Sequence, residues 1–170
     1  MLKNFFKFFF LIFFLNYSNS YSNEKIAFID LDFVLKNSII GNSILDDIEK
    51  LNEKNISELK IKEKELKKNE DEILAKKNIL SEEEYKKEVE LLKEKITKYK
   101  LLKDEMVSDL KKKKKISFNN FFNQINPIIQ NYMDENSINL LLERKNVFIG
   151  KTDSDITNSI IDKINKEFKN

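Results

Sequence analysis

The 170-residue sequence contains no cysteine, no histidine and no tryptophan, and it has only two glycines and one proline. Without cysteine, the chain can form neither disulfides nor thiolate metal sites, and it offers no attachment point for a lipoprotein anchor. Without histidine, it lacks the commonest general base and metal ligand. The scarcity of glycine excludes a glycine-rich phosphate loop, and with it an ATP-driven machine. We therefore expect a non-enzymatic protein with no metal and no cofactor.

Charge is abundant, because 35% of the residues are charged. Many charges combined with few turn-forming residues favour long solvated helices over a compact sheet protein. The first 22 residues hold two of the 31 basic residues, so the rest of the chain carries 31 − 2 = 29 basic residues against 29 acidic ones. This balance, together with the export signal described next, argues against nucleic acid as a partner.

Residues 1–22 have the three parts of a secretory signal peptide. Lys3 and Lys7 give a positive start, residues 8–15 (FFFLIFFL) form an apolar core, and a segment of small polar residues follows. Cleavage is expected after Ser20 or Ser22. The apolar core is much shorter than the roughly 20 residues of a membrane-spanning helix, so an uncleaved anchor is the less favoured alternative.

We predict a single domain over residues 23–170, with a body formed by residues 23–41 and 134–170. Three apolar segments, 25–31, 138–142 and 147–149, predict short strands that meet in one sheet. An amphipathic helix from Ile156 to Phe168 would complete a core that is too small to be stable alone, so oligomerisation would supply the missing burial. The candidate residues of the body core and oligomer interface are Ile26, Phe28, Ile138, Leu140, Leu142, Val147 and Ile149.

The remaining segment, residues 42–133, predicts an antiparallel helical hairpin with its turn near residues 78–82. The turn precedes a capping box of Ser81 and Glu84, which is a strong helix-start signal. On the return arm, apolar residues recur at alternating steps of four and three, with Lys103 filling one position. The outgoing arm has a thinner seam, because asparagines occupy several of its positions. The hairpin seam residues are Leu59, Leu66, Ile73, Leu80, Tyr85, Val89, Leu92, Ile96, Tyr99, Met106 and Leu110.

Four segments resemble the Skp/OmpH family of periplasmic chaperones: KIAFID at 25–30, LSEEEYKKEVELL at 80–92, the segment 125–149, and SDITNSIIDKINK at 154–166. Ser38 with Gly41, before the long helix, adds to the resemblance. Their order behind a signal peptide makes the resemblance specific. It implies a mainly α fold with a small β body, which assembles as a trimer with the hairpins surrounding a cavity. It also implies that unfolded outer-membrane proteins are held there without ATP, in the periplasm. Separately, we expect the outer- or inner-membrane surface as a further partner.

Five residues are candidates for contact with clients: Lys111, Lys112, Lys115, Phe121 and Ile128. The lysine run at 111–115 would attract anionic client segments or lipid headgroups. The alternative, a plain solvated helix face, is favoured because charge runs usually have that role. Phe121 and Ile128 lie beside the seam and would either pack on the body or face the cavity.

Two other kinds of protein fit parts of the pattern. A membrane-anchored stalk, such as the b-type subunit of rotary ATP synthases, also combines an apolar N-terminus with long charged helices. The short apolar core and the three strand segments argue against a stalk. A secreted coiled-coil adaptor with one specific partner stays open.

Overall fold

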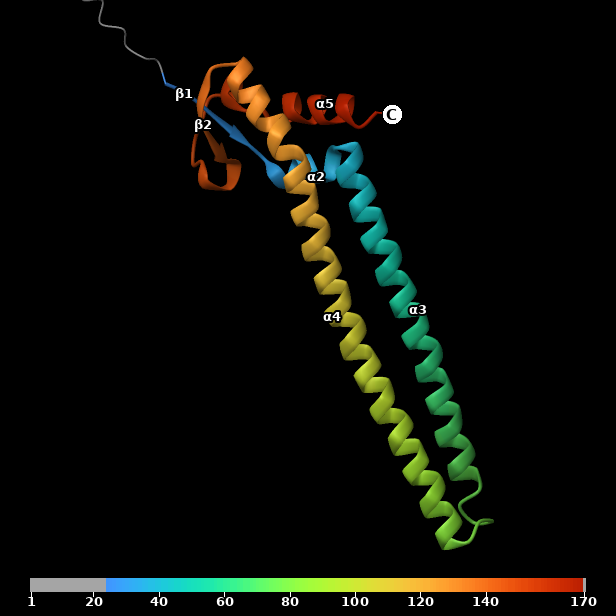
Figure 1. Cartoon of the computed structure of the whole chain (residues 1–170). Coiled ribbons are helices and arrows are strands. Elements are labelled where there is room, and N and C mark those ends of the chain that lie inside the picture. The colour runs from blue at the N-terminus through green and yellow to red at the C-terminus, as the bar shows by residue number, and fades with distance from the viewer. Residues whose placement is uncertain (1–23, 170) are drawn as a thin grey trace, which may run out of the picture.

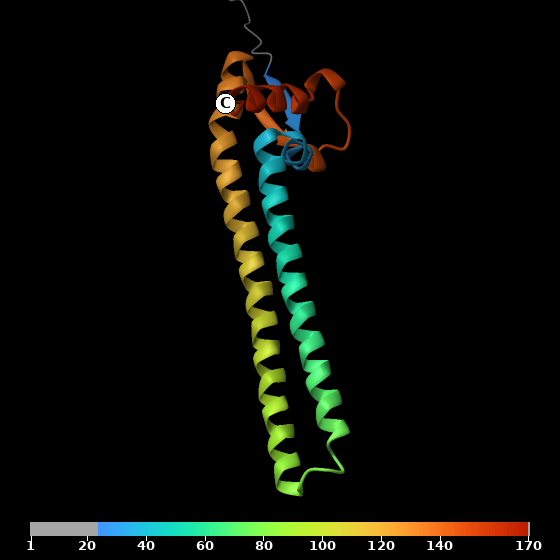
Figure 2. The ribbon, with the colours of Figure 1, turned by 90° about the vertical axis from the view of Figure 1, so that its right-hand side faces the viewer.

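In the computed structural model, which describes residues 24–169, one long helical hairpin projects from a small body (Figures 1 and 2). The expected signal peptide, residues 1–22, lies outside the described residues. The predicted fold class, mainly α with a small β body and a long antiparallel hairpin, is confirmed. The elements in chain order are β1 (Lys25–Ile29), α2 (Leu31–Asn37), α3 (Ile39–Ala75), α4 (Glu82–Glu135), β2 (Ile138–Glu143), the 3-10 turns η1 (Arg144–Asn146) and η2 (Thr152–Ser154), and α5 (Thr157–Glu167).

The sheet contains two parallel strands, β1 and β2, whereas the sequence predicts three. The chain between them runs out and back through the hairpin, which supplies the crossover that a parallel pair requires. Residues 147–149, the expected third strand, belong to no strand in the described part of the chain. An extended segment becomes a strand only when a neighbour accepts and donates hydrogen bonds, and here the Val147 N–H donates to the Arg144 carbonyl (3.0 Å) instead.

The two faces of β1 differ in exposure. The sequence predicts that the face with Ile26 and Phe28 is buried, but this is the more exposed face. Ala27 and Ile29 are buried beneath the helices, whereas Ile26 is 48% exposed and Phe28 is half-buried. Successive side chains of a strand point to opposite faces, so only one of the two sets can meet the core. Of the seven candidate core residues, only Ile138 is buried within the chain.

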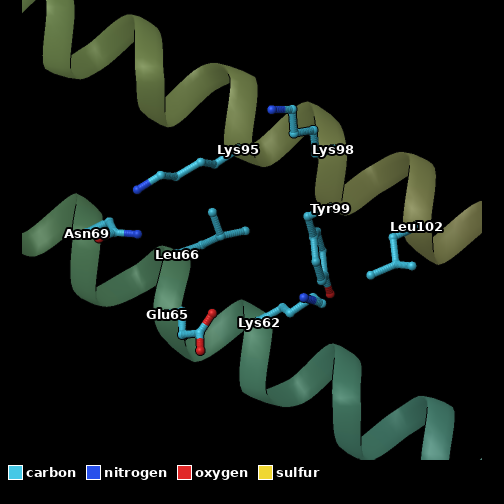
Figure 3. A pocket seen from close by; sticks show the side chains of 8 residues that line it. All are labelled: Lys62, Glu65, Leu66, Asn69, Lys95, Lys98, Tyr99 and Leu102. Atoms are coloured by element: carbon cyan, nitrogen blue, oxygen red, sulfur yellow. The ribbon is translucent and has the colours of Figure 1, made fainter.

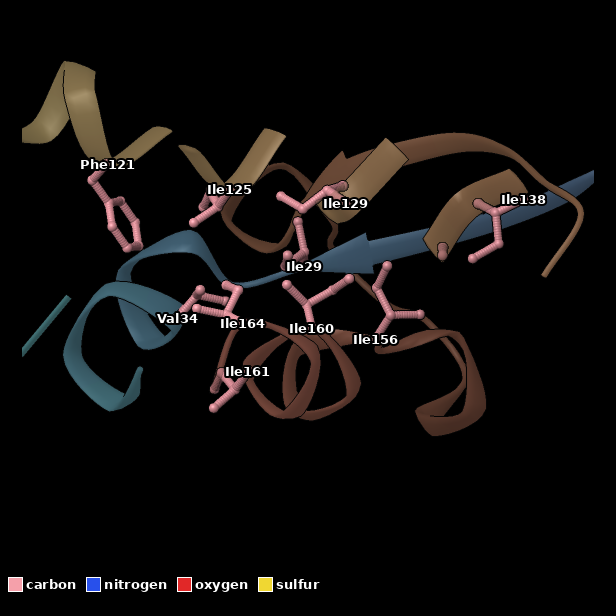
Figure 4. Close-up of a cluster of buried hydrophobic side chains, with 11 residues drawn as sticks. Ile29, Val34, Phe121, Ile125, Ile129, Ile138, Ile156, Ile160, Ile161 and Ile164 are labelled. Carbon is pink, nitrogen blue, oxygen red and sulfur yellow. The ribbon is translucent and has the colours of Figure 1, made fainter. Parts of the chain in front are cut away.

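The core lies between the covered face of the sheet and the helices α2, α4 and α5 (Figure 4). α5 contributes the apolar stripe expected of an amphipathic helix. The last turns of α4, which the sequence assigns to the hairpin, contribute Phe121, whose ring packs edge-to-face on Phe122 with centroids 5.4 Å apart. The buried cluster consists of Ala27, Ile29, Val34, Phe121, Ile125, Ile129, Ile138, Ile156, Ile160, Ile161 and Ile164.

A tight corner joins α2 to α3 and fixes the hairpin on the body. Ser38 is fully buried at this corner, and its hydroxyl accepts a hydrogen bond from the Gly41 N–H (3.2 Å). The side-chain oxygen of Asn165, on α5, accepts from the Ile39 N–H (2.8 Å), which satisfies a second free donor of the helix start. The long helix therefore begins at Ile39 rather than at residue 42.

Replacing Gly41 by alanine is expected to destabilise the protein by about 2 kcal/mol, in the range of other overpacked sites. A Cβ atom at this position would lie 2.0 Å from the Leu35 carbonyl oxygen, which is backbone and cannot rotate away. The overlap outweighs the helix propensity that alanine adds. Gly150→Ala is the matched control, because its Cβ would meet a side-chain atom of Phe28 at 2.8 Å, which can move. Urea denaturation measures the free energy of unfolding of both variants. Equal losses of stability would contradict the close approach of Gly41 to the Leu35 carbonyl.

Candidate functional site: the hairpin and the open face of the sheet

The seam of the hairpin is apolar on α4 and mixed on α3, where polar residues alternate with Leu59, Leu66 and Ile73. The inward positions of α3 include Asn55, Lys62 and Asn69, all half-buried against α4. α3 therefore covers the apolar side of α4 only in part. Ile73 is buried, and the other predicted seam residues are half-buried: Leu59, Leu66, Leu80, Tyr85, Val89, Leu92, Ile96, Tyr99, Met106 and Leu110.

One step of the α4 seam differs from the expected spacing. Lys103 is exposed, and Leu102 is half-buried in its place. Burying an apolar side chain is favourable, whereas burying an ammonium group is costly, so the helix presents the leucine. Tyr99, Leu110 and Phe121 lie eleven residues apart, and all three are covered, Phe121 fully. An eleven-residue repeat has about 3.67 residues per turn, which leads this face of α4 from the seam into the body core.

A groove of about 270 Å³ lies between the arms midway along the hairpin. Figure 3 shows Tyr99 reaching from α4 toward Lys62 of α3, with Leu66 between the two helices. The groove lies where α3 presents the polar residues Lys62 and Asn69 to α4. It is lined by Lys62, Glu65, Leu66, Asn69, Lys95, Lys98, Tyr99 and Leu102.

The tip of the hairpin combines a well-formed helix cap with exposed apolar residues. The Glu84 N–H donates to the Ser81 hydroxyl (3.3 Å), and Ser81 returns hydrogen bonds from its own hydroxyl (2.7 Å) and N–H (3.0 Å) to the Glu84 carboxylate. These bonds hold the pKa of Glu84 below its usual value, so the cap stabilises the helix at neutral pH and weakens as the carboxylate is protonated in acid. Ile79, in the turn, is 82% exposed.

The candidate client-facing residues of α4 divide into exposed and buried ones. Lys111, Lys112 and Lys115 are exposed, and within the described residues Lys112 is the one member of the lysine run in an ion pair, with Asp109 (3.2 Å). Phe121 is fully buried in the body core, so the expectation that it faces clients is wrong and its packing alternative holds. Ile128 is half-buried against the same core.

The uncovered face of the sheet forms an apolar surface at the end of the body. Ile26 pairs with Leu140 across the strands, and the two are 48% and 49% exposed. Leu142 adds to the same face at 36%. Phe148 and Ile149, in the loop that follows, are almost fully exposed. We call these five residues the open face.

An ion pair anchors the loop that presents Phe148. Arg144, the single arginine of the chain, donates to the Asp155 carboxylate (2.7 Å). The other oxygen of Asp155 accepts from the N–H of Thr157 (3.0 Å), and the Thr157 hydroxyl accepts from the Asp30 N–H (2.9 Å). The network connects both ends of the 144–155 segment to β1, so the exposed apolar residues sit on a fixed support.

Within residues 24–169, no group of three or more acidic side chains is placed to hold a metal ion. Across the same range, none of the helices combines the length and apolar character needed to span a membrane.

Comparison with known proteins gives one family and one fold. The model of the family described as outer membrane protein (OmpH-like) matches residues 25–164. A solved structure from Caulobacter crescentus CB15, described as a candidate outer membrane chaperone (OmpH-like), has a TM-score of 0.80 to this chain at 14% sequence identity, over 87% of this chain and 88% of that one. At this identity the likeness establishes a shared fold. A search of curated proteins finds no match.

Proposed function

The chain belongs to the OmpH-like outer membrane protein family, and from this membership and the geometry of the hairpin we propose that it is an ATP-independent holdase of the periplasm. Its clients are unfolded outer-membrane proteins, and it reaches the periplasm through the cleaved signal peptide. The proposal is supported by the order of elements, in which a small body carries one long hairpin.

The observation that carries the proposal is the incomplete cover of the α4 seam. Apolar residues such as Leu92, Tyr99 and Met106 are half-buried, and α3 places Lys62 and Asn69 beside Tyr99 in the groove. A surface of this kind offers many weak apolar contacts along about 40 Å of helix, at 1.5 Å per residue from Tyr85 to Leu110. Weak contacts that act together retain a client by multivalency and still let its chain move.

Assembly through the open face would bring several hairpins around one client. The exposed pair of Ile26 and Leu140, with Phe148 beyond it, has the apolar character of a subunit interface. The outer edge of β2 is paired with no other strand in residues 24–169, so a second copy can extend the sheet. We propose a homotrimer, the assembly that the family resemblance implies.

Aggregation of chemically unfolded barrel proteins tests the holdase proposal. At least three unrelated outer-membrane proteins are diluted from urea with and without the mature chain, and light scattering is followed without nucleotide. We expect all of them to stay in solution at a stoichiometric excess of trimer. Protection of one client alone would identify an adaptor, and protection of none would contradict the proposal.

The mature protein's mass in solution, with and without a client, tests the assembly. We expect three chains in the free protein and three chains plus one client in the complex. A free protein of one chain at micromolar concentration would contradict the trimer.

A further inference from the structure

The positions that flank the seam on one side carry matching residues on the two arms. On α4 these positions come directly after Leu92, Tyr99 and Met106, and the fourth lies seven residues further along. On α3 each position comes directly after an inward residue, and the positions are also seven residues apart. All of them are exposed. Three of the four positions on α4 are lysine and three of the four on α3 are glutamate. The flanking residues are Lys93, Lys100, Val107 and Lys114 on α4, and Glu70, Glu63, Ile56 and Glu49 on α3.

The register of the hairpin sets these residues opposite one another. The groove between the arms brings Leu66 and Asn69 of α3 to Lys95 and Tyr99 of α4. The arms are antiparallel, so each step forward on α4 is a step back on α3. In that register, four rungs form along the hairpin about 10 Å apart, at seven residues per rung. The rungs are Lys93–Glu70, Lys100–Glu63, Val107–Ile56 and Lys114–Glu49.

A shift of the arms by seven residues destroys the match. In one direction Lys100 would face Ile56 and Val107 would face Glu49. In the other direction Lys93 would face Lys77. The observed register thus has three opposite-charge rungs and one apolar rung, and neither neighbouring register does. In coiled coils, residues at such flanking positions set partner choice and orientation.

None of the ion pairs found in residues 24–169 joins α3 to α4. Glu70 accepts from Lys67 of its own helix (3.1 Å). The charges of the rungs therefore act across the gap between the arms, where their attraction depends on ionic strength. Polar residues such as Asn55 and Lys62 weaken the apolar seam of α3, so that these charges can contribute to register and separation.

We propose that these four rungs, which we call the charge ladder, set the register and the separation of the two arms, and that parting the arms exposes the α4 seam to clients. The second part of this proposal, the exposure of the α4 seam to clients, rests on the proposed function. The ladder also gives the lysine run a role, because Lys114 of that run faces Glu49. Low ionic strength closes the hairpin, and high ionic strength opens it.

Distances between spin labels on the two arms test the ladder. The chain has no cysteine, so Ser57→Cys and Ser108→Cys place one label on an exposed position of each arm. Labelled protein is mixed with an excess of unlabelled protein, so that each assembly holds one labelled chain. Pulsed electron paramagnetic resonance is recorded at about 10 mM and about 1 M salt, where the screening lengths are roughly 30 and 3 Å. We expect longer distances at high salt.

Charge reversal at Lys100 and Glu63 tests whether this rung acts across the hairpin. Lys100→Glu and Glu63→Lys are each expected to shift the closed population by about 2- to 5-fold at low salt, the effect of one exposed pair. The double variant is expected to restore the wild-type distances. The control is Lys64→Glu, which changes the net charge as Lys100→Glu does but lies on the side of α3 opposite Lys62 and Leu66. Distances that ignore salt, or a double variant no closer to wild type than its parents, would overturn the ladder.

The link to clients has its own measurement. The single reversals are expected to suppress client aggregation at lower protein concentration than wild type, and the double variant is expected to match wild type. Opened arms with unchanged suppression would overturn this link and leave the ladder standing. A wild-type protein that protects no client would contradict the proposed function, and the label distances would still report on the ladder.

Discussion

Replacing Phe121 by alanine is expected to lower the free energy of unfolding by about 4 kcal/mol, within the range measured for buried phenylalanines. The ring is fully buried where α4 enters the body, so its removal leaves a cavity in the core. Its edge-to-face contact with Phe122 is lost as well. For a chain of this size the loss corresponds to a fall of about 10 °C in the melting temperature.

The matched control is Phe33→Ala, the same chemical change at a side chain that is 46% exposed. Its cost is expected to stay below about 1 kcal/mol, as for most surface substitutions. Circular dichroism of both variants during thermal and urea unfolding gives the comparison. Equal losses in the two variants would show that Phe121 does not hold the hairpin on the body.

The course of the hairpin could be predicted from the sequence because its signals are periodic. The capping box at Ser81 marks the return of the chain, and the apolar steps from Tyr85 to Leu110 mark the inward side of α4. The exchange of Lys103 for Leu102 depends on residue type, because the expected seam position is a lysine and the residue beside it is a leucine.

The small sheet is harder to predict, because β1 is apolar on both faces. In the segment KIAFI, alternation does not distinguish Ala27 and Ile29 from Ile26 and Phe28. The helices α4 and α5 cover one face, and that choice depends on tertiary packing. The segment 147–149 has the composition of a strand, but it has no strand partner within residues 24–169. Strand propensity describes a fit to a neighbour, which the single chain does not provide.

Replacing Leu140 by lysine is expected to leave the single chain folded and to prevent its assembly. Leu140 is 49% exposed and lies on the sheet face away from the core, so a lysine there keeps its ammonium group in water. In an assembly through the open face, the same group would be buried against Ile26 and Phe148 of neighbouring copies. An unpaired buried charge costs several kcal/mol, so assembly is expected to weaken by at least about 100-fold.

For Leu140→Lys, light scattering coupled to size-exclusion chromatography is expected to give the mass of one chain. Its circular dichroism spectrum is expected to remain helical. Leu101→Lys is the control, because it makes the same change at a residue of α4 that is 64% exposed and lies on the hairpin. It is expected to keep the mass of the wild type. If Leu140→Lys keeps that mass too, assembly does not use the open face. If the mass falls and clients are still held in solution, one hairpin is sufficient and multivalency across copies is not the basis of holding.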